Sequence, residues 1–142
     1  MECTVRWGGL EGGMTFVAET GSGHAFVMDG APEGGGRNLG PRPMETVLAG
    51  TAACTAYDVV LILKKSRQDV RGCHVNVTAE RATTDPKVFT RINMHFVVRG
   101  RNLKPAAVER AVQLSHEKYC SASAMLAKTA AMTLTHEIVD DA

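Results

Sequence analysis

Short alternating segments open the chain. Apolar and polar residues alternate over 3–7, 14–19 and 24–29, which predicts three strands separated by glycine-containing turns. The following stretch, 30–43, shows no periodicity and is rich in glycine and proline, so we expect a loop there. We interpret this loop as a connector, with a loop that gates a substrate pocket as the alternative.

The most apolar segment comes next and has the character of a long helix. We expect the helix to begin near Pro43, because proline suits the first helical turn, and to run to about Arg67. Its last residues, "KKSR", place positive charge where a helix C-terminus favours it. The apolar stretch Val47–Leu63 has 17 residues, the short limit for a membrane span, and polar residues interrupt it. We therefore predict a buried core helix and no membrane segment.

The second half of the chain predicts a hairpin, a second helix and a final strand. Alternation over 73–81 and 88–100 predicts two paired strands. The apolar positions of this hairpin are Val75, Val77, Ala79, Ile92, Met94, Phe96 and Val98. A helix begins near Pro105, breaks near Cys120–Ser123 because serines compete for backbone hydrogen bonds, and continues briefly to Lys128. A strand over 132–139 completes a single α+β domain spanning 1–142.

Composition narrows the possible partners. A net charge of +1 and an aromatic fraction of 5% give no basis for binding nucleic acid or an anionic membrane. The N-terminus lacks the pattern of a signal peptide, so we expect a cytoplasmic protein. The four cysteines form neither a CxxC motif nor zinc-like spacing with histidine. In a reducing compartment we expect them to be thiols, and we expect no cofactor.

Cys54 lies within a polar stripe of the long helix. At ~100° per residue, Thr51, Cys54, Thr55 and Asp58 fall on one side, and we expect this polar stripe to be in contact with water. Hydrogen bonds in a polar pocket can support a thiolate, whereas the carboxylate of Asp58 would raise the pKa of the thiol. The alternative is that Cys54 is a packing residue and that the threonines bond back to helix carbonyls.

Cys120 is the second candidate thiol. His116 and Glu117 precede it by four and three residues, and a protonated histidine nearby would favour its thiolate. The alternative is that both polar side chains are solvated and Cys120 simply packs. Cys3 and Cys73 lie in strand-like segments without such neighbours, and we interpret them as structural.

Two segments resemble a known family when taken together. "GPRPMETVLAGTAACTAYDVV" and "VERAVQLSHEKYCSASAML" are similar to the OsmC/Ohr family, the osmotically inducible and organic-hydroperoxide-resistance proteins, and the similarity extends over nearly the whole chain. "PME" and "CTAYDVV" are closer to the OsmC-like branch than to the Ohr enzymes. The resemblance implies an OsmC-like fold, in which two β-sheets wrap around two central helices in an intertwined homodimer with the active site at the interface.

The same resemblance implies a chemistry. By motif position, Cys54 matches the cysteine that attacks a small organic hydroperoxide, and Cys120 matches the one that resolves the sulfenic acid to a disulfide. A dithiol then reduces the disulfide, and the activity serves oxidative-stress defence. The alternatives are a non-catalytic protein that binds a small apolar ligand or senses redox state, and a metal site. The candidate metal ligands are Cys54, Asp58, Cys120 and His116.

The residues that activate the thiol in Ohr-type enzymes have no clear match. Their glutamate directly follows the proline, but Met44 holds that place here and Glu45 comes next. On a regular helix Glu45 faces away from Cys54, because nine residues separate them. Three arginines are candidates for the family's activating arginine: Arg6, Arg37 and Arg42.

Overall fold

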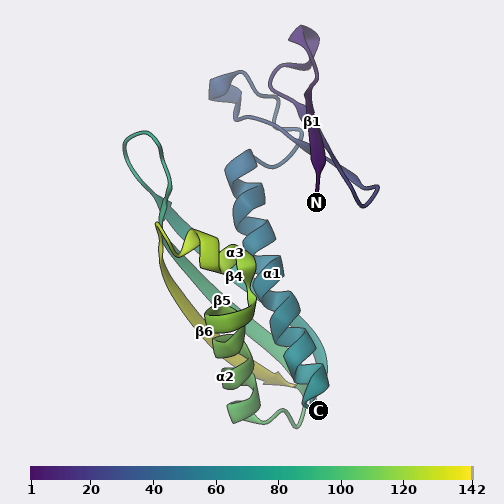
Figure 1. The fold of residues 1–142 in the computed structure, drawn as a ribbon, viewed down its shortest axis with the longest axis vertical. Helices are drawn as coiled ribbons and strands as arrows, with labels where there is room; N and C mark the ends of the chain where they lie inside the picture. The colour runs from purple at the N-terminus through teal and green to yellow at the C-terminus, as the bar shows by residue number, and fades with distance from the viewer. Residues whose placement is uncertain (142) are drawn as a thin grey trace. The chain divides into compact units, whose positions relative to one another are not determined.

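A computed structural model of the protein describes residues 1–141. The chain forms two compact units, Met1–Ala49 and the part that begins at Gly50. Their boundary falls inside the long helix α1 (Pro43–Lys65). The secondary structure is mixed α+β with two three-stranded sheets, as the sequence predicts (Figure 1).

The first unit contains an antiparallel sheet in the order β1-β2-β3. Its strands are β1 (Cys3–Trp7), β2 (Phe16–Thr20) and β3 (Ala25–Met28). The three strands predicted from alternation are thus confirmed. The connections also contain two single 3₁₀ turns, η1 (Leu10–Gly12) and η2 (Pro32–Gly34), which periodicity could not reveal because each is only one turn long.

The glycine-rich stretch after β3 is a packed turn held by Asp29. The Asp29 side chain is 1% exposed and accepts hydrogen bonds from the backbone N–H groups of Gly30 (2.7 Å), Arg37 (3.4 Å) and Leu39 (3.2 Å). The hydroxyl of Thr15 donates a fourth, at 3.1 Å. Burial alone would raise the pKa of Asp29, but these donors together hold it below its ordinary value.

The helix α1 ends two residues earlier than predicted. Arg67 adopts the left-handed conformation (φ 60°), and the N–H of Gln68 bonds to the carbonyl of Leu63 at 3.0 Å. This local cap stops the helix at Lys65. By length and composition alone α1 could cross a membrane. Only 28% of its most apolar window is buried within the single chain, so the predicted burial of the helix holds for one side of it and not for the whole. The residues buried on it are Thr51, Ala52, Thr55, Val59 and Leu63.

The second sheet has the order β4-β5-β6. Strands β4 (Asp69–Arg81) and β5 (Phe89–Arg101) form the predicted antiparallel hairpin, with Val75 opposite Phe96 and Val77 opposite Met94. Strand β6 (Ala131–Asp140) runs parallel to β5, so the chain must cross over between them. The crossover consists of α2 (Pro105–Leu114), η3 (Ser115–Tyr119) and α3 (Ser121–Leu126).

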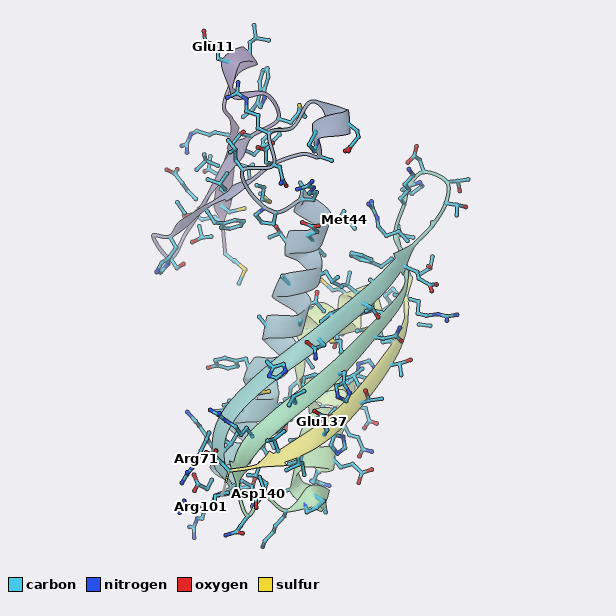
Figure 2. All side chains as sticks on the ribbon, turned by 180° about the vertical axis from the view of Figure 1, so that it is seen from behind. Glu11, Met44, Arg71, Arg101, Glu137 and Asp140 are labelled. Carbon is cyan, nitrogen blue, oxygen red and sulfur yellow. The ribbon has the colours of Figure 1, made fainter. Side chains whose placement is uncertain are left out.

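Helices cover one face of this sheet, and the other face is open. The two opposite views agree that α2 and the part of α1 beyond Gly50 lie on the same side (Figures 1 and 2). The fully buried side chains between them include Val59, Leu63, Ile92, Met94, Phe96, Val98 and Val108. Figure 2 shows Arg71, Arg101 and Asp140 together at one end of the sheet. There Arg71 bridges Asp69 (2.9 Å) and Asp141 (3.4 Å).

Candidate thiol site

The structure brings Cys54 and Cys120 together. Cys54 lies in the middle of α1, and Cys120 directly follows η3. The two thiols are near neighbours, because each one shifts the pKa of the other. Cys120 is 2% exposed, whereas Cys54 is half-buried. All four cysteines are free thiols, and Cys3 is exposed and Cys73 half-buried.

A π-helical turn positions Cys120. The N–H of Cys120 bonds to the carbonyl of Ser115, five residues earlier, at 2.8 Å, so η3 is wider than an α-helical turn. Cys120 itself is extended (φ −75°, ψ 104°), and α3 begins at the next residue. The predicted break near Cys120 is therefore confirmed. The widened turn was not expected, because sequence periodicity does not separate π from α turns.

The polar stripe of α1 is only partly in contact with the solvent. Thr51 is 2% exposed and Thr55 is 0% exposed, so the expected contact with water is wrong for these two, whereas Cys54 and Asp58 are half-buried. An exposed apolar side chain, Tyr57, lies away from the buried threonines and is 70% exposed. Buried threonines are tolerated on the inner side because each can hydrogen-bond there.

Those buried groups form a network between α1 and the crossover. The hydroxyl of Thr55 donates to the carbonyl of Thr51 at 3.0 Å and lies 3.2 Å from Sγ of Cys120. The hydroxyl of Ser115 donates to the carbonyl of Thr55 at 3.0 Å and lies 3.3 Å from a carboxylate oxygen of Asp58. The backbone N–H of Ser123 donates to Sγ of Cys120 at 3.4 Å. The sulfur of Cys120 therefore has one backbone donor, Ser123, and one hydroxyl partner, Thr55, which can either donate to it or accept from it.

The surroundings separate the acidities of the two thiols. Burial raises the pKa of Cys54, and the neighbouring Cys120 and Asp58 raise it further against the N–H of Ala122, which lowers it. Burial also acts to raise the pKa of Cys120, but hydrogen bonds from Ser123 and Thr55 and the contact with Cys54 lower it below its ordinary value. In this chain the negative charge is therefore better supported on Cys120 than on Cys54.

His116 does not provide the support for Cys120 that its spacing suggested. Its side chain lines a groove of about 470 Å³ between α2 and β6, together with Gln113 and His136. Nδ1 of His116 is buried there without a hydrogen-bond partner among the described residues. Within residues 1–141 no group of three or more His, Cys, Asp and Glu side chains is arranged to hold a metal ion, so the metal alternative gains no support.

The candidate activators of the thiol are engaged elsewhere. The carboxylate of Glu45 accepts a hydrogen bond from the N–H of Arg42 at 2.9 Å, which caps the start of α1. The guanidinium of Arg42 bonds to Asn38 at 2.5 Å, Arg6 pairs with Glu19, and Arg37 donates to the carbonyl of Glu11. All of these partners belong to the first unit.

A second groove, of about 430 Å³, opens beside Asp58. Its walls come from α1 and from the end of the crossover. The lining is mostly apolar, with Leu61, Ile62, Leu114 and Tyr119. Asp58, which also lines this groove, accepts a hydrogen bond from Ser115, so the groove adjoins the thiol network.

Sequence reasoning missed Ser115, Ser123 and the contact between Thr55 and Cys120. That contact joins residues 65 positions apart, a separation for which no local spacing rule exists. The only signal was the cluster of small polar residues around Cys120, which predicted a break in the helix but not its hydrogen-bond partners.

Comparison with known proteins agrees with this architecture. The family model of the OsmC-like proteins matches residues 34–135. Protein YhfA of Escherichia coli K12 is 49% identical over 139 residues, 98% of this chain and 98% of that protein. The crystal structure of a hypothetical protein from Aquifex aeolicus VF5 has 29% identity and a TM-score of 0.84, covering 99% of this chain and 97% of that one.

A more distant structure has the same fold. A Legionella pneumophila protein described as an organic hydroperoxide resistance protein OsmC has 18% identity and a TM-score of 0.70, covering 96% of this chain and 97% of that one. The resemblance inferred from the two cysteine-bearing segments is thus confirmed for nearly the whole chain. On the match of the family model and the identity to YhfA, the chain belongs to the OsmC-like family.

Proposed function

We propose that this protein is a thiol-dependent peroxidase that reduces small organic hydroperoxides. The observation that carries the proposal is that Cys54 and Cys120 are near neighbours in a site lined by buried hydroxyl groups. In the proposed cycle the thiolate of Cys54 attacks the hydroperoxide, releases an alcohol and becomes a sulfenic acid. Cys120 then displaces hydroxide to form a disulfide, and an external dithiol restores both thiols.

Exposure and surroundings support this division of roles. Cys54 is the more exposed of the two thiols, so a substrate can reach it first, whereas Cys120 is 2% exposed and suits a reaction with a neighbouring sulfur. The apolar groove beside Asp58 favours an alkyl group over water, which supports organic hydroperoxides over hydrogen peroxide. A structural neighbour from Legionella pneumophila carries the description of an organic hydroperoxide resistance protein.

We also propose that the active form is a homodimer in the cytoplasm that takes part in oxidative-stress defence. Each unit of the chain exposes apolar side chains that a solvated monomer would leave in water. In the first unit these include Trp7 (48% exposed) and Leu10 (91%), and on α1 beyond Gly50 they include Tyr57 (70%). An intertwined dimer would cover such surfaces.

The test uses two single variants and a matched control. Cys54→Ser should abolish hydroperoxide reduction with a dithiol reductant, because a serine hydroxyl is barely ionised at neutral pH and forms no sulfenic acid. Cys120→Ser should consume about one equivalent of hydroperoxide per site and then stop as a sulfenic acid, which excess oxidant converts to sulfinic acid. Cys73→Ser should retain full turnover, since Cys73 lies outside the thiol network.

Peptide mapping supplies the structural readout. Mild treatment of the wild-type protein with an organic hydroperoxide should link Cys54 to Cys120 while the protein stays folded, since a disulfide requires Cα atoms within roughly 7 Å. Multiple turnover by Cys120→Ser with a dithiol would refute the resolving role. If the wild type reduces neither organic hydroperoxides nor hydrogen peroxide, the peroxidase proposal is refuted. The alternative of a non-catalytic protein that binds a small apolar ligand then takes its place, with the apolar groove beside Asp58 as the binding site.

A further inference from the structure

The hydroxyl of Thr55 stands between two acceptors. It lies 3.0 Å from the carbonyl oxygen of Thr51 and 3.2 Å from Sγ of Cys120. A hydroxyl has one proton to donate, so it can serve only one of these acceptors fully at a time. Thr55 is 0% exposed, and a buried polar group without a hydrogen-bond partner is costly. The acceptor to which the Thr55 hydroxyl donates must therefore depend on whether Cys120 is a thiol or a thiolate.

Each protonation state of Cys120 has its own satisfied arrangement. When Cys120 is a thiol, its S–H donates to the oxygen of Thr55, and the hydroxyl of Thr55 donates to Thr51. When Cys120 is a thiolate, the hydroxyl of Thr55 turns to donate to the sulfur, which also accepts the N–H of Ser123 at 3.4 Å. Only a rotation of the Thr55 hydroxyl hydrogen separates the two arrangements, so no heavy atom has to move.

We propose that Thr55 is a positioning residue whose hydroxyl decides which sulfur of the pair carries the negative charge. When the pair carries one negative charge, Cys120 holds that charge, and Cys120 removes the proton from Cys54 when Cys54 attacks the substrate. This inference rests on the proposed peroxidase cycle and adds a second role for Cys120, that of internal base.

The groups around the pair favour this order. Cys120 has the N–H of Ser123 and the hydroxyl of Thr55 as partners, whereas the N–H of Ala122 at Cys54 is opposed by the carboxylate of Asp58. The pKa values follow the same order, lowered for Cys120 and raised for Cys54. The titratable side chains of η3, the turn that directly precedes Cys120, are His116, Glu117, Lys118 and Tyr119.

The reaction balances with one proton passed between the sulfurs. The proton of Cys54 moves to the thiolate of Cys120, and the new thiolate of Cys54 breaks the O–O bond of the hydroperoxide. Sulfur gains the terminal OH as a sulfenic acid, and the leaving alkoxide takes the proton from Cys120 to become the alcohol. The thiolate of Cys120 then attacks the sulfur of the sulfenic acid, forms the S–S bond and releases hydroxide. The proton that Cys120 gave up to the solvent when it first ionised converts this hydroxide to water.

The experiment follows each thiol by NMR of the reduced protein labelled with ¹³C at the cysteine Cβ atoms, titrated with pH in the absence of peroxide. In the wild type Cys120 should ionise at lower pH than Cys54. In Thr55→Val, which keeps the shape of the side chain and loses the hydroxyl, the thiolate fraction of Cys120 at a fixed pH within the titration should fall by about ten- to a hundredfold. Thr55→Ser should restore the wild-type titration of Cys120.

Several outcomes would overturn the inference. Ionisation of Cys54 before Cys120 in the wild type is one, and it needs no variant, so it stands even if Thr55→Val fails to fold. An unchanged titration of Cys120 in folded Thr55→Val is another. Because no peroxide is present, these results are independent of turnover. If Cys120 ionises before Cys54 but the wild type shows no turnover, the proposed peroxidase activity is refuted and the proposed effect of Thr55 on the thiols stands. If the wild type turns over hydroperoxide but Cys54 ionises first, only this inference is refuted.

Discussion

Single buried polar side chains organise the irregular parts of this protein. Asp29 gathers four donors and so fixes the turn that follows β3. The hydroxyl of Ser115 links the π turn to α1 by donating a hydrogen bond to the carbonyl of Thr55. In each case the polar group sits where water cannot replace a missing partner, so its removal would leave several groups unsatisfied. Loops without regular structure can thereby be as well defined as the sheets they connect.

The contribution of Asp29 to stability should depend on pH. Its pKa is lowered in the folded protein, so the unfolded chain binds the proton more readily. The stabilisation is therefore fully present above the unfolded pKa of about 3.9 and is lost as the pH falls through the folded value. Urea unfolding at several pH values should show a smaller acid-induced loss of stability for Asp29→Asn than for the wild type, and lower stability of the variant at neutral pH.

Glu33→Gln is the matched control for Asp29→Asn, because Glu33 is an exposed carboxylate in the same turn. It should leave both the neutral stability and the acid dependence close to those of the wild type. An Asp29→Asn variant with the pH dependence of the wild type would show that the four donors at Asp29 do not favour its ionised form.

At the scale of elements, α1 has two faces with different uses. The inner face holds the thiol network and the packing residues Val59 and Leu63, both 0% exposed. The outer face holds Tyr57 and Leu61, which are 70% and 36% exposed. A helix that is apolar on both sides needs a second partner for its outer side, which explains why hydropathy alone gives it the profile of a membrane span.

Truncation of leucine on the two faces should have different effects. Leu63→Ala removes fully buried packing and should lower the free energy of unfolding by about 2–5 kcal/mol. Leu61→Ala removes a side chain that the single chain leaves 36% exposed, and should cost less when both leucine variants are made in a Tyr57→Arg background, which is expected to be shifted towards monomer. Chemical denaturation of the two variants in that background measures the difference. Equal losses for the two leucines would contradict this assignment of the faces.

At the scale of the whole molecule, the exposed apolar surface predicts a homodimer. Sedimentation should give twice the mass of the chain at micromolar concentration, with an interface above about 2,000 Å², as in obligate dimers. Tyr57→Arg, which places a charge on the outer face of α1, should shift the protein towards monomer. His74→Arg, a charge added at an exposed position on β4, is the matched control and should leave the mass unchanged. A wild type that sediments as a stable folded monomer would refute the dimer.

Local patterns in the sequence determined the order and most boundaries of the elements. The three N-terminal strands, the β4–β5 hairpin with its apolar face and the break at Cys120 all follow from rules that act over a few residues. Alternation and helical periodicity describe such short-range geometry well, because successive side chains point in fixed directions along a strand or helix. The two cysteine-bearing segments, read together, also identified the family.

Only the tertiary structure decided how those elements use their polar residues. The pattern of α1 showed a polar stripe but not which side of the helix would face the sheet, and the structure buries Thr51 and Thr55 of that stripe while Cys54 and Asp58 stay half-buried. The parallel pairing of β6 and the hydrogen bond between Thr55 and Cys120 likewise depend on residues far apart in the chain. Such contacts form only when separate elements pack, so their energies leave no periodic trace in the sequence.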